Sequence, residues 1–402
     1  MLGLANTVSS GSTPESKYSL NFDGANDYVD TGNTFSTTFA GSFTISMWLK
    51  PDDGQNGIQY LLGSGNASLN DSVRAFISSG KVGFILEAHD STATRVDTDS
   101  TVFSSGAATS WTHLAFVSNI TGTGTDKTTL LIYVNKVLVA QTYTEQSLTA
   151  ANHLQFSSDI NFILGGLNNN GSTSSNSYDG KIDEASIWNA ALDADNVTAI
   201  YNSGRPTNLT FDNGNYNNSS ALQAYYRMGN GTFDDKANGV VHDQHAPGFG
   251  SNLIVWDGST TGDWNETQSG NTTLSANSGN LRAAADASGA YGTSRGCTTV
   301  VGSVYRVDAT INVDNASGGT GNFRVSNNIS LASQIATLST STGTFLSYFT
   351  ATATTTYVGV IDTAADDTNY MEIEKISVRQ LNGLPGLTSN VDVPTAFSSD
   401  TP

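Results

Sequence analysis

Apolar and polar residues alternate in short runs along most of the chain. Examples are SFTISMWLKP (42–51), RAFISSGKVGFILEAHD (74–90) and TLLIYVNKVLVAQTY (129–143), and Gly, Asn, Asp and Ser residues separate such runs. Short runs with a period of two residues, bounded by turn residues, are typical of an all-β sandwich or barrel. In the third run Asn135 and Lys136 lie between two apolar segments, which predicts a hairpin turn.

One segment breaks this rhythm. In LDADNVTAIYNSG (192–204) the apolar residues have helical spacing, Asp193 precedes them and Gly204 follows them. Asp is a favoured N-cap and Gly a favoured residue just after a helix. We predict one short helix here, which closes the first domain.

The fold class predicted from these patterns is all-β, with two tandem β-sandwich domains. Residues from Asn382 onwards have little apolar periodicity and include Pro385 and Pro394, which predicts an extended tail. The predicted parts are a flexible N-terminal arm at 1–14, a first sandwich at 15–208, a connector at 209–250 packed against it, a second sandwich at 251–381 and the C-terminal tail at 382–402.

The composition narrows the range of partners. The chain has 36 acidic and 17 basic residues and a formal net charge of −19. Such a chain repels phosphate backbones, so we expect no nucleic-acid binding. No run approaches the roughly 18 apolar residues of a membrane helix, so we expect no membrane insertion. Cys297 is the only cysteine, so no intrachain disulfide is expected, and the N-terminus lacks the basic start of a secretory signal.

Five segments carry a family resemblance. LNFDGANDYVDTG, FTISMWLKP, SWTHLAFV, LLIYVNKVLVA and GKIDEASIWNAALDADNVTAIYNSG occur in this order between residues 20 and 204. The series resembles the concanavalin A-like lectin/glucanase superfamily in its laminin-G-like form, which implies a two-sheet antiparallel jelly roll. NLIVWDGSTTGDW (252–264) and NYMEIEKISVRQL (369–381) resemble the opening and closing strands of jelly-roll carbohydrate-binding modules.

Acid pairs are the candidates for catalysis. Asp183 and Glu184 are adjacent in a predicted strand, so they point to opposite faces and cannot flank one scissile bond. Glu372 and Glu374 are two residues apart and are predicted to share a face. The resemblance implies that glucanases of the superfamily carry a Glu-x-Asp-x-Glu or similar run on one strand, and the third acid of such a run is missing here. We therefore expect no enzyme activity, and a solvated edge or a second cation site at Glu372 and Glu374.

A structural calcium site is the functional alternative for these acids. The NFDGAND segment contains Asp23, Asn26 and Asp27, whose oxygen atoms suit calcium. The resemblance implies that the first and last strands are neighbours, which brings this loop close to Asp183. We predict calcium at these four residues. The alternative is that Asp183 caps turn amides while Glu184 faces water.

Recognition of a sugar needs an exposed aromatic ring and planar polar side chains. Trp48, Trp111 and Trp188 lie in apolar runs and are expected in the core, whereas Trp256 lies in a polar setting. Two loops, 168–179 and 54–60, are rich in hydrogen-bonding groups, and loops on a rigid sandwich often carry recognition. The predicted ligand-binding residues are Trp256, Asn169, Asn170, Tyr178, Gln55 and Asn56. The alternative for each loop is a plain solvated turn.

The layout of the whole chain resembles virion-associated proteins of marine tailed phages. This resemblance implies a non-enzymatic virion accessory protein, either a capsid decoration or a fibre-like appendage, made in the host cytoplasm without a signal peptide. The partners expected are other virion proteins, a cell-surface polysaccharide and further copies of the chain, such as a trimer. The alternatives are a secreted or cell-surface bacterial glycan-binding protein and a glycoside hydrolase.

Overall fold

The computed structural model describes residues 16–65, 71–88, 90–173, 176–256, 261–267, 270–314, 321–339, 342–365, 368–383, 385–393 and 395–402. The arm predicted at residues 1–14 lies outside this part of the chain.

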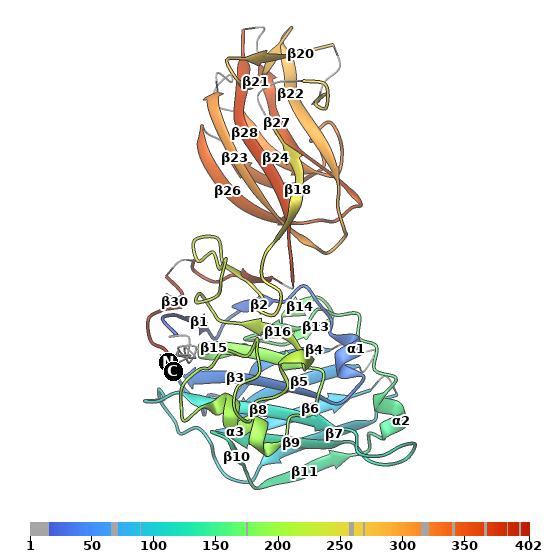
Figure 1. The fold of residues 1–402 in the computed structure, drawn as a ribbon, viewed down its shortest axis with the longest axis vertical. Coiled ribbons are helices and arrows are strands. Elements are labelled where there is room, and N and C mark those ends of the chain that lie inside the picture. The colour runs from blue at the N-terminus through green and yellow to red at the C-terminus, as the bar shows by residue number, and fades with distance from the viewer. Residues whose placement is uncertain are drawn as a thin grey trace, which may run out of the picture. The chain divides into compact units, whose positions relative to one another are not determined.

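The chain forms two compact units (Figure 1). Unit 1 consists of the residues up to Pro247 together with Gly383–Pro402, and unit 2 is Gly248–Asn382. The all-β class with two sandwich domains is confirmed. The tandem order is wrong, because unit 2 is inserted between two parts of unit 1. The Asn382 amide donates to the Gly248 carbonyl over 3.0 Å, so the chain enters and leaves unit 2 at adjacent points.

The first sheet of unit 1 has eight strands among the described residues, and its pairings are antiparallel. In spatial order these are β10 (Val137–Leu138), β9 (Thr129–Val134), β8 (Thr112–Asn119), β3 (Phe43–Pro51), β15 (Asp179–Trp188), β1 (Ser19–Asp23) and β30 (Phe397–Ser398), with β16 (Leu222–Tyr226) also paired to β15.

The second sheet of unit 1 has eleven strands in the same part of the chain. In spatial order these are β11 (Gln141–Gln146), β7 (Ala93–Thr98), β6 (Lys81–Glu87), β5 (Ser72–Ser78), β4 (Ile58–Gly65), β12 (Ile163–Leu164), β2 (Tyr28–Asp30), β29 (Gly386–Ser389) and β17 (Val240–Val241), with β13 (Asn168–Asn169) and β14 (Ser172–Thr173) beside β4. The expected hairpin turn at Asn135 and Lys136 is confirmed, since both residues have positive φ and Val134 pairs with Val137.

Helices are short. They are α1 (Ser36–Phe39), α2 (Ala150–His153), α3 (Ala194–Tyr201) and the 3-10 turn η1 (Ser219–Ala221). The predicted helix is confirmed as α3, and the Asp193 side chain accepts a hydrogen bond from the Asn196 amide. The helix ends at Asn202, whose φ is 44°. No helix in the described residues is long and apolar enough to cross a membrane.

The core of unit 1 lies between its two sheets. Alternate residues of each strand point inward, for example Ile45 and Met47 of β3 and Val73 of β5, all fully buried. A smaller apolar cluster on the outer side of the first sheet packs α3 and β16 against Trp188. Both faces of β3 and β15 are therefore covered, which explains why these strands are buried almost throughout.

The C-terminal segment is an integral part of unit 1, so the prediction of an extended tail at 382–402 is wrong. Strand β29 lies between β2 and β17, and β30 pairs with β1. The Asp400 carboxylate accepts hydrogen bonds from Lys50 Nζ at 2.8 Å and from Trp111 Nε1 at 3.1 Å. Trp111 is thus a partly exposed anchor for this segment, and its placement in the core was also wrong. The segment evaded prediction because its strands are two and four residues long.

The predicted connector at 209–250 also belongs to unit 1. Its strand β16 pairs with β15, and β17 pairs with β29, which confirms packing against the first domain. The predicted boundary at 208 therefore falls inside the unit.

Unit 2 is a second two-sheet sandwich. One sheet contains β20 (Thr272–Asn277), β21 (Asn280–Ala285), β28 (Tyr370–Leu381), β23 (Val304–Asp314) and β26 (Gly343–Thr350), with β18 (Phe249–Val255) paired to β28. The other contains β19 (Asn265–Glu266), β22 (Gly289–Thr298), β27 (Thr355–Ala365), β24 (Asn322–Ser326) and β25 (Gln334–Ser339). A separate apolar core fills this unit.

The buried His113 of β8 makes the stability of unit 1 depend on pH. The ring lies beside Trp48 and Tyr201, with centroids 5.1 and 5.9 Å away, and its Nε2 shares a hydrogen bond with Ser46 Oγ at 2.7 Å. Complete burial lowers the pKa of His113 to about 3. The ring is therefore neutral in the folded protein at pH 5, where an unfolded His is charged.

We expect the stability of the protein to decrease measurably as the pH is lowered. The unfolded chain takes up a proton below about pH 6.5 and the folded chain does not, so stability falls as the pH decreases toward about 3. Between pH 6.5 and 5 the loss from this one group is about 2 kcal/mol. Urea unfolding of His113→Gln should show lower stability at pH 7 but a smaller decrease toward pH 5. An equal decrease in both proteins would contradict a neutral buried ring.

Candidate functional site

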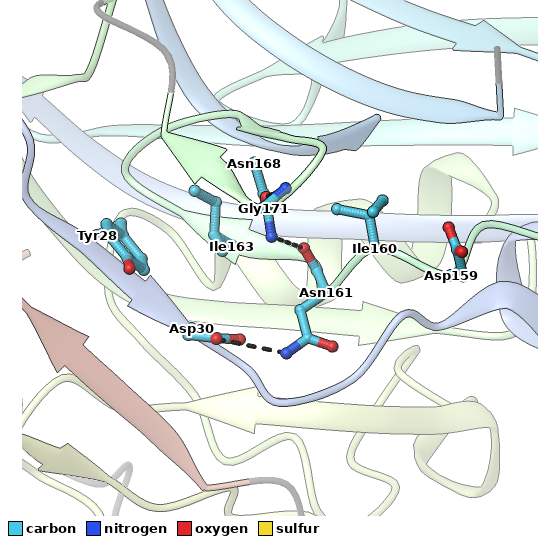
Figure 2. A pocket seen from close by; sticks show the side chains of 8 residues that line it. All are labelled: Tyr28, Asp30, Asp159, Ile160, Asn161, Ile163, Asn168 and Gly171. Atoms are coloured by element: carbon cyan, nitrogen blue, oxygen red, sulfur yellow. Dashed lines mark hydrogen bonds between the residues drawn. The ribbon is translucent and has the colours of Figure 1, made fainter. Parts of the chain in front are cut away.

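A pocket with a volume of about 340 Å³ opens on the second sheet of unit 1 (Figure 2). This size falls within the range of small-molecule sites, roughly 300–1,000 Å³. Its lining comes from β2, the segment before β12, β12 itself and the β13–β14 hairpin. The lining residues are Tyr28, Asp30, Asp159, Ile160, Asn161, Ile163, Asn168 and Gly171.

Strand β2 supplies the aromatic ring and one carboxylate. Val29 is fully buried in the core and pairs with Leu164, so its neighbours Tyr28 and Asp30 point to the opposite, outer face. Ile163 lies directly opposite Asp30 and shares that face. Because β2 is flanked by β12 and β29, this outward pair rests on a strand hydrogen-bonded on both sides.

Hydrogen bonds fix the polar wall of the pocket. The Asp30 carboxylate accepts from the Gly32 amide at 2.8 Å and, more weakly, from Asn161 Nδ2 at 3.4 Å. The carbonyl of Asn161 accepts from Asn168 Nδ2 at 2.9 Å. Figure 2 shows Asn161 in the middle of this chain of contacts, which links β2 to the distant segment that runs from Asn161 to Asn168.

A tight hairpin forms the remaining wall. Asn169 pairs with Ser172, and the two residues between them, Asn170 and Gly171, both have positive φ, of 54° and 82°. Two successive positive φ values define the turn type for which Asn-Gly is the preferred sequence. The Gly171 amide donates to Asn168 Oδ1 at 3.0 Å, so the turn also orients the Asn168 side chain.

The predicted recognition loops are separated by the fold. Asn169 and Asn170 are exposed on the hairpin next to the pocket, as the loop prediction required. Gln55 and Asn56 are also exposed, but they precede β4, whose far end pairs with Asn169. The eight residues from Ile58 to Gly65 span roughly 23 Å, so the two loops do not form one site.

Two predicted ligand-binding aromatics are core residues, and their assignment was wrong. Tyr178 is fully buried in unit 1, and its hydroxyl donates to the Lys181 carbonyl. Trp256 is 6% exposed in the core of unit 2, and its Nε1 donates to the Gly279 carbonyl. Polar neighbours in the sequence did not reveal that the ring of Trp256 turns inward.

The register of β1 and β15 changes the predicted calcium ligands. The two strands are neighbours, as expected, but Asp179 lies opposite Asp23. Asp183 is four residues farther along β15, roughly 13 Å away. The grouping of Asp183 with Asp23, Asn26 and Asp27 is therefore wrong. No group of three or more His, Cys, Asp or Glu side chains among the described residues is placed to hold a metal ion.

Asp27 is the buried acid of the β1–β2 loop. One oxygen, Oδ2, accepts from the Asp23 amide at 3.0 Å, whereas Oδ1 is buried without a hydrogen-bond partner. Burial raises the pKa of Asp27 to about 6, and nearby Asp23 and Asp392 contribute. Asn26 and Asp23 are exposed, and Asn390 Nδ2 donates to the Asn26 carbonyl at 3.0 Å.

Asp183 and Glu184 belong to a buried network. A register shift between β15 and β3 follows Asp183, and Glu184 has a φ of 50°, so the regular alternation of faces is broken here. Glu184 is 4% exposed and pairs with Arg227 Nε at 3.1 Å, while the Tyr225 hydroxyl donates to its other oxygen. The expectation that Glu184 faces water is wrong.

Both carboxylate oxygens of Asp183 are also engaged in hydrogen bonds within the protein. Its oxygens accept from the Glu184 amide at 2.8 Å and from Ser16 Oγ at 2.6 Å. Burial raises the pKa of Asp183 well above its usual range, and Glu184 raises it further. Asp183 therefore caps a backbone amide, that of Glu184, as the alternative to calcium binding expected. It also holds Ser16, at the start of the described chain.

The two acids of the second pair, Glu372 and Glu374, have different environments. Glu372 is buried and bonded to Arg282 Nε at 2.6 Å and to Asn277 Nδ2 at 2.6 Å. Ile373 and Lys375 lie opposite consecutive residues of β23, so Glu374 occupies a bulge and is exposed. The prediction that both acids share one regular face, at a solvated edge, is wrong, since β28 is flanked by other strands.

The sequence did not single out the main residues of the pocket. Tyr28 and Asp30 alternate around Val29 in a predicted strand, a signal that places them on one face without saying which. Asp159 and Asn161 belong to no sequence pattern that predicts a site, and only the pairing of β12 with β2 brings them close to Asp30. The Asn-Gly pair at 170–171 was a readable turn signal.

Comparison with known proteins finds a family model that matches part of unit 1. Residues 23–198 match the family model described as "Concanavalin A-like lectin/glucanases superfamily". No curated protein matches the chain. Among solved structures, the CBM40 of the IT-sialidase from Ruminococcus gnavus is 18% identical with a TM-score of 0.35, over 46% of this chain and 97% of that chain.

Two further solved structures are similar at the same low level. The heptameric SAP-like pentraxin from Limulus polyphemus is 12% identical, with a TM-score of 0.33, over 46% of this chain and 82% of that chain. A putative carbohydrate binding protein from Bacteroides ovatus is 17% identical, with a TM-score of 0.36, over 57% of this chain and 56% of that chain. The family match confirms the resemblance predicted for the first domain, and residues 23–198 are the part of this chain that is similar to the concanavalin A-like lectins and glucanases.

Proposed function

We propose that unit 1 binds a glycan in the pocket of Figure 2. The observation that carries the proposal is the outward placement of the Tyr28 ring and the Asp30 carboxylate beside the Asn161 amide. An aromatic ring next to planar hydrogen-bonding groups matches the apolar faces and hydroxyls of a sugar. The lectin-like family match of residues 23–198 supports this reading.

The test is a binding screen of the full chain on a glycan array, followed by calorimetry with the best ligand. Asp30→Ala removes an acceptor and Tyr28→Ala removes the ring, so each should weaken binding by tenfold or more. Gln55→Ala, on the separate exposed loop, is the matched control and should bind like the wild type. Binding that survives both pocket variants would refute the proposal.

In this proposal the protein is not an enzyme. The support is that Asp183 and Glu184 are engaged in a buried network, and that Glu372 is held in an ion pair while Glu374 lies in a bulge. A screen against laminarin, agarose and related polysaccharides should yield no product. Turnover that is lost in Asp30→Asn would instead identify the pocket as a hydrolase site.

We retain calcium as a structural cofactor, with a smaller set of ligands. The buried, unpartnered Oδ1 of Asp27 fits a cation, and Asp23 and Asn26 offer further oxygens, whereas Asp183 is excluded by its own contacts. Calcium should raise the melting temperature of the protein, and a chelator should reverse this.

Asp27→Asn is the decisive variant for calcium. It should abolish the response to chelator, and Asp183→Asn should preserve the response. In chelator at pH 8, Asp27→Asn should melt at or above the wild-type temperature, because it removes a charge that burial disfavours. A melting curve that is the same with calcium and with chelator would refute the cofactor.

The setting that we propose is a phage virion, in which the protein acts as a capsid decoration or a fibre-like appendage. Its partners there are other virion proteins, a host cell-surface polysaccharide and further copies of itself, such as a trimer. The support is the layout of the chain, two sandwiches of lectin style with a net charge of −19. Immunogold labelling of intact particles tests this setting. Labelling of uninfected bacterial cells instead would favour a bacterial glycan-binding protein.

A further inference from the structure

The pocket on unit 1 presents two carboxylates. Of its eight lining residues, Asp30 and Asp159 are acidic, and none is Lys, Arg or His. We infer that this pocket selects uncharged sugar residues and rejects acidic ones such as uronic and sialic acids, an inference that rests on the proposed glycan-binding function. Two independent properties of the lining carry it, the balance of hydrogen-bonding groups and the charge.

Each amide donor group of the wall already makes one hydrogen bond within the wall. Asn161 Nδ2 donates to Asp30, and Asn168 Nδ2 donates to the Asn161 carbonyl (Figure 2). The Gly171 amide donates to Asn168 Oδ1. Each Nδ2 keeps a second N–H, so the wall offers a ligand two amide donors, against the larger acceptor capacity of the Asp30 and Asp159 carboxylates.

The acceptors that remain suit sugar hydroxyls. A carboxylate has about four acceptor positions, and the contacts of Asp30 occupy two of them, from Gly32 and Asn161. A hydroxyl can donate into the others. The carboxylate of an acidic sugar can only accept, so beside the Asp30 and Asp159 carboxylates it would lose hydrogen bonds that it makes with water.

Charge acts in the same direction. Asp159 is exposed at the rim, whereas Asp30 is partly buried on the floor formed by β2, so a ligand carboxylate meets like charge at both positions. The Debye length at physiological salt is about 8 Å, and a pocket of about 340 Å³ brings charges within roughly that distance of one another. Salt therefore does not remove the repulsion.

The test uses pairs of sugars that differ by one carboxylate. Calorimetry of the full chain compares galactose with galacturonic acid, glucose with glucuronic acid, and lactose with sialyllactose, in calcium and again in chelator, since a cation can bridge two carboxylates. In the pair that binds, we expect the uncharged member to bind about tenfold or more tightly than the acidic one. The preference should shrink at high salt.

A substitution that changes charge but not shape isolates the cause. Asp159→Asn should increase affinity for the acidic sugar and so reduce the ratio of the two affinities by severalfold. Asp195→Asn changes the net charge equally on the exposed surface of α3, and should leave the ratio unchanged. A ratio unaffected by Asp159→Asn would overturn the electrostatic explanation.

The outcomes separate the inference from the proposed function. An acidic sugar that binds as tightly as its uncharged counterpart in chelator, and whose binding is lost in Tyr28→Ala, overturns the inference and supports the pocket as a glycan site. If no sugar of either kind binds and the glycan array is blank, the proposed function fails and the inference fails with it.

Discussion

Removal of residues 383–402 is expected to unfold unit 1 while unit 2 stays folded. The deletion removes β29 from its place between β2 and β17 and removes β30 from the edge of β1. It also removes the buried Phe397 ring and the Asp400 contacts with Lys50 and Trp111. Burial of one Phe contributes about 1.5–3 kcal/mol, and the lost strand hydrogen bonds add to that.

The total cost is comparable with the stability of a typical domain, about 5–15 kcal/mol. Calorimetry of the truncated chain should therefore show the transition of unit 2 alone. The matched control deletes residues 248–382 and joins Pro247 to Gly383 through a few Gly and Ser residues. Since the entry and exit of unit 2 are hydrogen-bonded neighbours, this chain should retain the transition of unit 1. If the truncated chain kept both transitions, the C-terminal strands would be dispensable and the inserted arrangement would be contradicted.

Arg227→Ala should destabilise unit 1 by about 3–5 kcal/mol, because it leaves buried acids without their cation. The Arg227 side chain is 13% exposed and pairs with the buried Glu184, which is adjacent to buried Asp183. The loss should be smaller at low pH, because burial raises the pKa of Glu184 and Asp183 and protonation then removes the unpaired charge. Urea unfolding at pH 5 and pH 8 measures this difference.

Two controls test the cause of that loss. Asp52→Ala breaks a partly exposed contact with Lys181, 3.9 Å long, and should cost less than about 1 kcal/mol. The double variant Arg227→Met with Glu184→Gln removes both charges and keeps most of the volume, so it should recover much of the stability lost in Arg227→Ala. A double variant no more stable than Arg227→Ala would indicate that packing around Arg227, rather than an uncompensated charge, is what matters.

The local features of the fold could be predicted because they depend on neighbouring residues. The period of two marked the long strands, the Asn135-Lys136 pair marked a hairpin, and Asp193 marked the start of α3. The low charge content of 13% and the dispersed turn residues favoured a sandwich over a helical bundle. These signals are short-range, so the tertiary structure did not need to be known.

The candidate site could not be predicted to the same extent, because it depends on contacts between distant segments. Asp30 meets Asn161 only through the pairing of β2 with β12, and Asp179 rather than Asp183 meets Asp23 because of the register. A shift of register changes every neighbour along a strand, and the sequence period does not contain that information.

The sequence by itself determined that this chain folds into β-sandwiches, that residues 23–198 are similar to the concanavalin A-like lectins and glucanases, and that the chain is acidic. Only the tertiary structure decided that the C-terminal strands complete unit 1, that Trp256 and Tyr178 are core residues, and that Tyr28, Asp30 and Asn161 share a pocket. The physical reason is that burial and strand pairing are collective. A two-residue strand or a tryptophan in a polar segment acquires its role from the surfaces that other parts of the chain bring to it.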